Sequence, residues 1–276
     1  MKELITAEAV MEKLRESGIR TMIQNVMKNG IKKTGITLKI ENGAAPILYL
    51  EDFTENASSA GEVAERMLPY FRDLTPPDIN VEALRDPSWL LSHMYIGLQR
   101  VNEEELIKAE SGYAGIEKYI YLRLDEKMQM STKLRSDFLR GTGITEEAAW
   151  DAAERNTFSE GETVVRELGE FMIGLGYEGP VDWNSGPYIV TNRPSCRGSV
   201  GILDREAIRR FFSEKGLSFR NFIVLPSSID ECLLVPTEGM PEPSELDIFT
   251  EMVQSINASE VAPEEQLGDQ AYVLEL

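Results

Sequence analysis

The stretch NFIVLPSSIDECLLVPTE, residues 221–238, decides how the C-terminal part of this chain folds. It holds two apolar segments, 221–228 and 231–238, joined by a tight connection at Ile229 and Asp230. Short apolar runs separated by polar turn residues are typical of neighbouring strands that are covered on at least one face. The stretch therefore predicts two adjacent strands that place four side chains in the core: Phe222, Val224, Leu233 and Val235.

The sequence around this pair predicts further strands and helices of the same lobe. PYIVTN at 187–192 and AYVLEL at 271–276 indicate strands. The segment 204–215 has apolar residues at helical spacing and ends at Gly216, and a second helix begins at Pro243. The C-terminal lobe should therefore contain strands covered by helices.

The N-terminal eighty residues have a different pattern, that of a helix, an antiparallel meander and a second helix. Asn29-Gly30 is a strong hairpin signal, because both residues tolerate a positive φ. Ser59 and Glu62 fit a capping box at the start of a helix. The expected elements are a helix over 3–17, strands over 20–28, 36–40 and 46–53 with a second turn at 41–43, and the helix that follows Ser59.

Thr75-Pro-Pro-Asp78 breaks the second helix and is the candidate boundary between two lobes, 1–80 and 81–276. Beyond it the pattern predicts strands over 90–101, 116–126 and 128–134, and helices over 145–155 and 162–175. The fold class should be α+β, with an N-terminal helix–antiparallel meander–helix lobe packed with a mixed-sheet C-terminal lobe.

The charge of the chain excludes several classes of partner. Its 276 residues contain 28 Lys and Arg against 47 Asp and Glu, a formal net charge of −19. Such a surface repels phosphate, so we expect no direct binding to nucleic acid and no binding to an anionic membrane. The longest apolar runs, such as FIVL at 222–225, are too short to cross a bilayer, and the N-terminus shows no signal-peptide pattern. A cytoplasmic location is the expectation.

Histidine and cysteine are too scarce for the common catalytic and metal centres. His93, Cys196 and Cys232 are the only such residues, whereas a structural zinc site needs four ligands. No phosphate-binding glycine motif and no nucleophile-elbow spacing occurs. We therefore expect no cofactor, no metal site and no catalytic residue, and we expect structural roles for His93 and Cys232.

The candidate binding site is the turn LPSSIDE, residues 225–231, together with Asn192 at the end of a predicted strand. A turn between two apolar strands presents hydroxyls and carboxylates on a rigid base. The other interpretation is a plain hairpin whose polar side chains cap turn amides. The candidate binding residues are Asn192, Ser227, Ser228, Asp230 and Glu231.

Three stretches resemble the domain-of-unknown-function family 5688: NVMKNGIKKTGITLKIENGAAPILYLEDF at 25–53, ITEEAAWDAAERNT at 144–157, and the C-terminal signature from PYIVTN through LPSSIDECLLVP to INASEVAPEEQLGDQAYVLEL. The resemblance extends over about 20–276 and is most specific in the last hundred residues. It implies a bacterial protein and assigns no activity, substrate, cofactor or catalytic residue.

Acidic residues are concentrated at the C-terminal end. Residues 221–276 contain twelve acids and no Lys or Arg. The favoured hypothesis is a non-catalytic interaction module that binds a protein partner, possibly a basic one, through its polar loops or this acidic surface. The alternatives are an acidic mimic of nucleic acid that inhibits a defence or replication protein, a hydrolase that uses the 225–231 turn, and a surface that serves only solubility.

Overall fold

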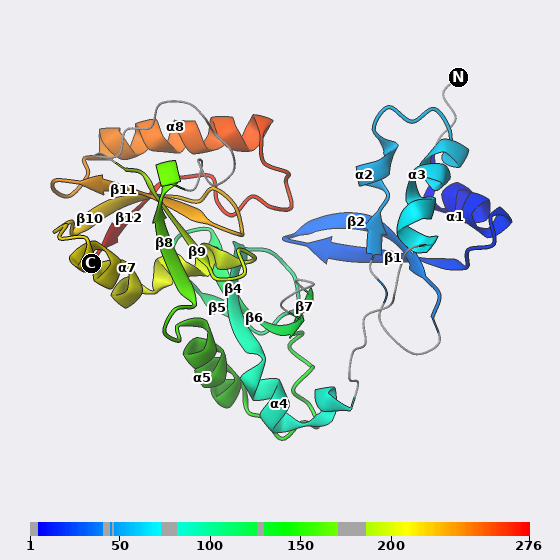
Figure 1. Cartoon of the computed structure of the whole chain (residues 1–276), viewed down its shortest axis with the longest axis horizontal. Helices are drawn as coiled ribbons and strands as arrows, with labels where there is room; N and C mark the ends of the chain where they lie inside the picture. The colour runs from blue at the N-terminus through cyan, green and yellow to red at the C-terminus, as the bar shows by residue number, and fades with distance from the viewer. Residues whose placement is uncertain (1–4, 41–44, 46, 73–81, 126–129, 171–185) are drawn as a thin grey trace. The chain divides into compact units, whose positions relative to one another are not determined.

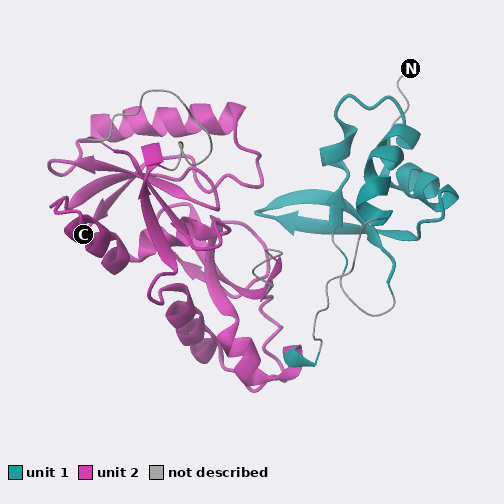
Figure 2. Cartoon of the chain, in the orientation of Figure 1, with its two compact units in different colours: residues 1–83 teal, residues 84–276 magenta. Residues whose placement is uncertain are grey.

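The computed structural model describes residues 5–40, 45, 47–72, 82–125, 130–170 and 186–276. They form two compact units, residues 1–83 and 84–276 (Figure 2), each with its own hydrophobic core. The boundary expected at Thr75–Asp78 lies outside the described residues. Helices alternate with antiparallel sheets in both units, which confirms the α+β class.

Unit 1 is a three-stranded sheet, in the order β1-β2-β3, covered by helices. The predicted hairpin is confirmed: β1 (Thr21–Lys28) pairs with β2 (Ile31–Leu38), and Asn29 and Gly30 have φ of 52° and 78°. The predicted third strand is shorter than expected, because β3 (Ile47–Tyr49) ends before the short helix α2 (Glu51–Thr54). The second turn expected at 41–43 lies outside the described residues.

The longer helices of unit 1 are α1 (Ala7–Glu16) and α3 (Ala60–Arg72), and they form its core with Ile36 of β2. The capping box is confirmed with one change. The Ser59 hydroxyl accepts from the Glu62 amide at 3.3 Å, but the Glu62 carboxylate reaches the amide of Ser58, at 2.8 Å, rather than that of Ser59.

Unit 2 begins with two short helices and a small sheet. η1 (Ala83–Arg85) and α4 (Pro87–Ser92) precede β4 (Met94–Arg100), so the strand predicted over 90–101 is wrong for its first residues. Asp86 caps α4 and Pro87 occupies its first turn, which favours a helix there. The small sheet has the order β4-β6-β5, with β6 (Ile116–Asp125) and β5 (Lys108–Glu110), and β7 (Met130–Lys133) also pairs with β6.

The large sheet has five strands in the order β12-β10-β11-β9-β8. The strands are β8 (Thr163–Glu167), β9 (Tyr188–Asn192), β10 (Asn221–Leu225), β11 (Cys232–Thr237) and β12 (Tyr272–Glu275). Each pair in the described residues is antiparallel, where mixed sheets were expected. The helix predicted over 162–175 is wrong for residues 163–167, which pair with β9 as β8. Residues 171–175 of that prediction lie outside the described residues.

The helices of unit 2 cover the two sheets. They are α5 (Glu146–Thr157), η2 (Gly198–Leu203), α7 (Arg205–Glu214) and α8 (Pro243–Ser259). Figure 1 shows α8 along one face of the sheet that contains β10 and β11. Within the described residues, no helix has both the length and the apolar composition that crossing a membrane requires.

The main core lies between the small and large sheets. It combines Ile96 and Ile120 of the small sheet with Val190, Phe222 and Val224 of the large one. Alternate residues of β10 and β11 face the other way, toward α8, where Val253 and Phe249 cover them. Of the four predicted core residues, Phe222 and Val224 are fully buried, and Leu233 and Val235 are half-buried on the α8 side.

Candidate functional site

The predicted turn between β10 and β11 stabilises itself through its polar side chains. The Ser228 hydroxyl donates to the Glu231 carboxylate at 2.7 Å and accepts from the Asp230 amide at 3.0 Å. The Ser228 amide donates to the Glu231 carbonyl at 3.1 Å. Ser227 is half-buried, and its backbone amide bonds the buried thiol of Cys232, whose pKa is raised by burial. These contacts are those of a turn whose side chains cap its amides.

The same turn holds the loop that follows β9. The Arg197 amide donates to the Asp230 carboxylate at 2.6 Å, and the Thr191 hydroxyl donates to the Asp230 carbonyl at 2.8 Å. The Ser199 hydroxyl donates to the Ile229 carbonyl at 2.7 Å. The end of β9 and the loop over residues 193–199 are therefore both fixed to the 225–231 turn by hydrogen bonds.

Asn192 closes this loop from its other end. Its amide group donates to the Cys196 carbonyl at 2.7 Å and its carbonyl oxygen accepts from the Cys196 amide at 3.0 Å. Two predicted site residues, Asn192 and Asp230, therefore hold the loop, whereas Ser228 and Glu231 bond each other within the turn. Ser227 takes no part in these loop contacts within the described residues.

The packing of the loop requires glycine at position 198. A Cβ atom there would lie 2.3 Å from the Thr191 hydroxyl and 2.4 Å from the Asn192 amide. The preceding residue, Arg197, adopts a φ of +55°, which is uncommon outside glycine. The hydrogen bonds to Asp230 and Asn192 thus hold a strained backbone that directs the Arg197 side chain toward the small sheet.

Arg197 is the site residue that sequence reasoning did not select. Its Nη1 donates to the Tyr119 hydroxyl at 2.5 Å, and its Nε donates to the Ser131 hydroxyl at 3.1 Å. The centre of the guanidinium lies 5.3 Å from the centre of the Tyr121 ring. Tyr119 and Ser131 precede Arg197 by 78 and 66 residues, so no local pattern could reveal the cluster.

The polar face of the small sheet carries three ion-pair groups around these tyrosines. Lys133 pairs with Glu104 at 2.9 Å, Lys108 with Glu117 at 3.1 Å, and Arg123 with Glu162 at 3.1 Å. Burial lowers the pKa of the Lys133 amine, against the opposing effect of Glu104. Burial raises the pKa of Tyr121 to about 12, although Arg123 and Arg197 oppose the shift. Burial also raises the pKa of Tyr119, so both tyrosines remain neutral hydrogen-bonding groups at neutral pH.

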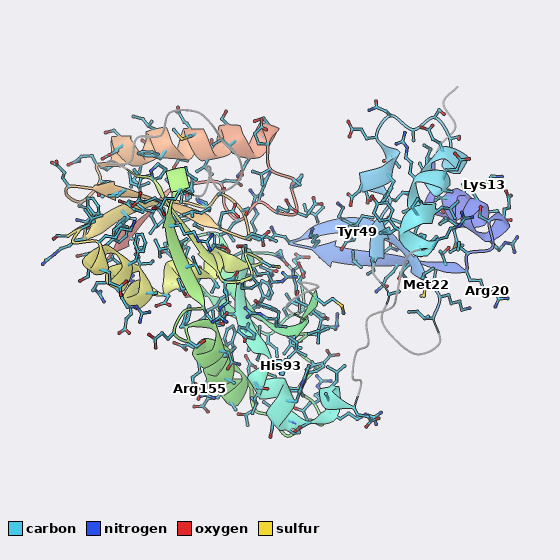
Figure 3. The ribbon with its side chains drawn as sticks, viewed as in Figure 1. Lys13, Arg20, Met22, Tyr49, His93 and Arg155 are labelled. Carbon is cyan, nitrogen blue, oxygen red and sulfur yellow. The ribbon has the colours of Figure 1, made fainter. Side chains whose placement is uncertain are left out.

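His93 has a structural position at the end of α4 (Figure 3). Its Nδ1 lies 2.8 Å from the Trp89 carbonyl and 2.9 Å from the Ser92 hydroxyl, and its ring stacks on Trp89 with centroids 3.8 Å apart. The residue follows a helix, whereas the sequence pattern placed it within a strand.

The acids of residues 221–276 differ in what they contact. Glu231 accepts from Ser228, Glu264 is buried, and Asp269 pairs with Arg100. Others lie exposed on α8, among them Asp247 and Glu251. The acids therefore do not form one uniform surface.

The outer face of α8 carries an apolar row. Ile248, Met252 and Ile256 are spaced four residues apart, and they are 64%, 45% and 45% exposed. Asp247 and Glu251 lie on the adjacent flank of the helix. We call these five residues the α8 face.

A family comparison matches residues 3–275 to a model described as a family of unknown function, DUF5688. The chain is a member of DUF5688. The match covers nearly the whole chain and confirms the resemblance read from the sequence. No curated protein and no solved structure gives a significant match.

Membership of DUF5688 defines the family without assigning a chemistry, so the site must be interpreted from its own groups. Among the residues the structure describes, no three His, Cys, Asp or Glu side chains lie together as metal ligands would. Two features of the described residues bear on binding: apolar side chains are exposed on the α8 face, and the Arg197 guanidinium bonds hydroxyl groups there.

Proposed function

We propose that this DUF5688 chain is a protein-binding module whose α8 face binds a basic partner. The single observation that carries the proposal is the exposed row of Ile248, Met252 and Ile256 beside Asp247 and Glu251. Exposed apolar rows bordered by charged residues are typical of protein interfaces. A partner with an apolar stripe and flanking Lys or Arg residues would complement both features.

The charge distribution supports a basic rather than a neutral partner. Residues 221–276 contain no Lys or Arg, so no cation of this segment competes for Asp247 and Glu251. Complementary charge raises the association rate and sets the orientation of the partner, while the apolar row supplies the buried contact.

The contacts of the other acids support this proposal over a mimic of nucleic acid. A phosphate mimic needs its carboxylates free along one surface, but Glu231 and Asp269 are bound to Ser228 and Arg100. The 225–231 turn also supports binding over hydrolysis, because the polar atoms of Ser228 and Asp230 already form hydrogen bonds within the turn and to its neighbouring loop.

The test is a comparison of variants of the full chain for partner binding. Cross-linking in the source cell with wild type and with an Ile248→Ser, Met252→Ser, Ile256→Ser variant identifies proteins that depend on the apolar row. The purified partner is then titrated with both proteins and with Asp247→Lys, Glu251→Lys. The matched control is Glu206→Lys, Glu214→Lys, which reverses two exposed acids on α7.

We expect both α8 variants to bind at least about tenfold more weakly than wild type, since each removes central contacts of the interface. The α7 control should bind like wild type, and high salt should weaken the wild-type complex. An equal loss of affinity in the α7 control would show that net charge, and not the α8 face, determines binding. Full binding by the apolar-row variant would contradict the proposal.

A further inference from the structure

The Arg197 cluster consists of Arg197, Tyr119, Tyr121, Ser131 and Lys133, which meet on the polar face of the small sheet. Three carboxylates belong to this face, those of Glu104, Glu117 and Glu162. Each already pairs with a cation other than Arg197. Lys133, Lys108, Arg123 and Arg193 pair with these carboxylates, so the Arg197 guanidinium is an additional positive charge beside them, in a chain whose net charge is −19.

Arg197 is the cation without a carboxylate. Across the part of the chain that the structure describes, no ion pair within 4.0 Å involves its guanidinium. An arginine side chain has five N–H donors. Two of them are used, on the hydroxyls of Tyr119 and Ser131, so three remain for another acceptor.

The two hydroxyls bound by Arg197 also keep a donor. Each accepts a hydrogen bond from the guanidinium, and neither donates one to any described residue. Tyr119 is only 1% exposed, and a buried hydroxyl normally donates as well as accepts. Burial raises the pKa of Tyr119, so its proton is retained at neutral pH. Arg197, Tyr119 and Ser131 therefore bring together donors that have no acceptor among the described residues.

The backbone at Arg197 is also costly to maintain. A φ of +55° at a non-glycine residue is strained, and Asp230 and Asn192 hold it through their hydrogen bonds to the loop. Strain of this kind concentrates where a side chain must be presented to a ligand. Arg197 as a whole residue is not fully buried, whereas Tyr119 beneath its guanidinium is.

We propose that the Arg197 cluster is a binding site for an oxyanion group, a phosphate or a carboxylate carried by a small ligand. The planar guanidinium binds two oxygens of such a group at once, and the hydroxyls of Tyr119 and Ser131 donate to the same group. The ligand supplies the negative charge that Arg197 lacks within the cluster. This site is separate from the α8 face, and neither proposal depends on the other.

The test measures anion-specific stabilisation of the full chain. The thermal midpoint is followed while phosphate or acetate is added, with sodium chloride at matched ionic strength as the reference. The variants are Arg197→Lys, which keeps the charge but loses the fork, and Tyr119→Phe, which loses one donor. Arg193→Gln is the matched control, because Arg193 lies in the same loop, is 62% exposed and pairs with Glu162.

We expect a saturable rise of the midpoint with phosphate or acetate beyond that with chloride. The apparent affinity should fall by about tenfold in Arg197→Lys and Tyr119→Phe and stay unchanged in Arg193→Gln. The more effective anion distinguishes a phosphoryl from a carboxylate ligand. No response beyond chloride, or a response that survives Arg197→Lys, would overturn the proposal.

A second measurement covers the case in which a variant does not fold. In the wild-type chain, the NMR resonance of the Arg197 Nε–H should shift saturably with the stabilising anion. The Nε–H of Arg193 should move only as it does with chloride. An Arg197 resonance that does not respond would overturn the proposal without any substitution.

Discussion

At some positions of unit 2, the residue type that fits is determined by side chains from other parts of the sequence, and Gly97 is an example. Gly97 lies on β4 opposite Tyr119 of β6. A Cβ atom at position 97 would lie 2.7 Å from the Tyr119 ring, well inside contact distance. Because Gly97 has no side chain, the Tyr119 ring can pack against the backbone of β4. Its hydroxyl then accepts a hydrogen bond from the Arg197 guanidinium.

Gly97→Ala should destabilise the chain by about 1–3 kcal/mol, because the added methyl group forces a buried ring out of position. Gly239→Ala is the control, since a Cβ there meets nothing within 4 Å. Urea unfolding of both variants measures the free energies. Equal stability of Gly97→Ala and wild type would show that the ring is free to move.

Asp230→Ala should cost about 1–3 kcal/mol, because it leaves the Arg197 amide without its acceptor. Asp230→Asn keeps an acceptor oxygen at the same place and should cost less. Chemical denaturation ranks the two variants. The reverse ranking would mean that the charge of Asp230, rather than its hydrogen bond, stabilises the loop.

At the scale of elements, β10 and α8 have faces with different roles. β10 is covered on both sides, by the main core and by α8, whereas α8 buries one side and exposes the other. A substitution in β10 should therefore change the stability of the chain, whereas a substitution on the exposed side of α8 should change partner binding.

Phe222→Ala should therefore cost about 3–5 kcal/mol, since the ring is fully buried and contacts Phe212 at a centroid distance of 4.9 Å. Ile248→Ala should change stability by no more than about 0.5 kcal/mol, because 64% of Ile248 is exposed. Parallel denaturation curves test the contrast. A large decrease in the unfolding free energy of Ile248→Ala would show that the α8 face stabilises the fold of the chain.

The element β8 shows where periodicity misleads. Val165 and Leu168 fit a helical stripe, but Thr163, Val164 and Val165 are β-branched, and the edge of β9 offers them hydrogen-bond partners. Spacing alone does not distinguish a short amphipathic helix from an edge strand when the partner strand lies more than twenty residues away.

At the scale of the whole molecule, buried tyrosines link stability to alkaline pH. Burial raises the pKa of Tyr113 and of Tyr121 from 10.0 to about 12. The unfolded chain loses these phenolic protons near pH 10, whereas the folded chain keeps them. The folded state therefore binds more protons between about pH 10 and 12, and its stability falls as pH rises through that range.

We expect phenolate absorbance and unfolding to rise together above about pH 10. Tyr121→Phe should reduce the slope of this loss of stability, because it removes one of the shifted groups. The measurement is the unfolding free energy at a series of alkaline pH values. Complete ionisation of the tyrosines in a chain that remains folded would contradict the expectation.

Features that depend on near neighbours in the chain can be predicted from the amino-acid sequence. The Asn29-Gly30 hairpin, the strands of residues 221–238 and the helix from Pro243 follow from local turn chemistry and periodicity. The sequence also selected Asn192, Ser227, Ser228, Asp230 and Glu231 as a polar group, because turn residues between apolar strands stand out in composition.

The role of that polar group depends on contacts between segments that are distant in the sequence. Asp230 and Asn192 hold a loop, and the loop places Arg197 against Tyr119 and Ser131. The exposure of Ile248, Met252 and Ile256 on α8 follows from the packing of Val253 and Phe249 against the sheet. A hydrogen bond or a buried face between two segments exists only when packing brings those segments together. The spacing of residues along one segment therefore does not reveal it.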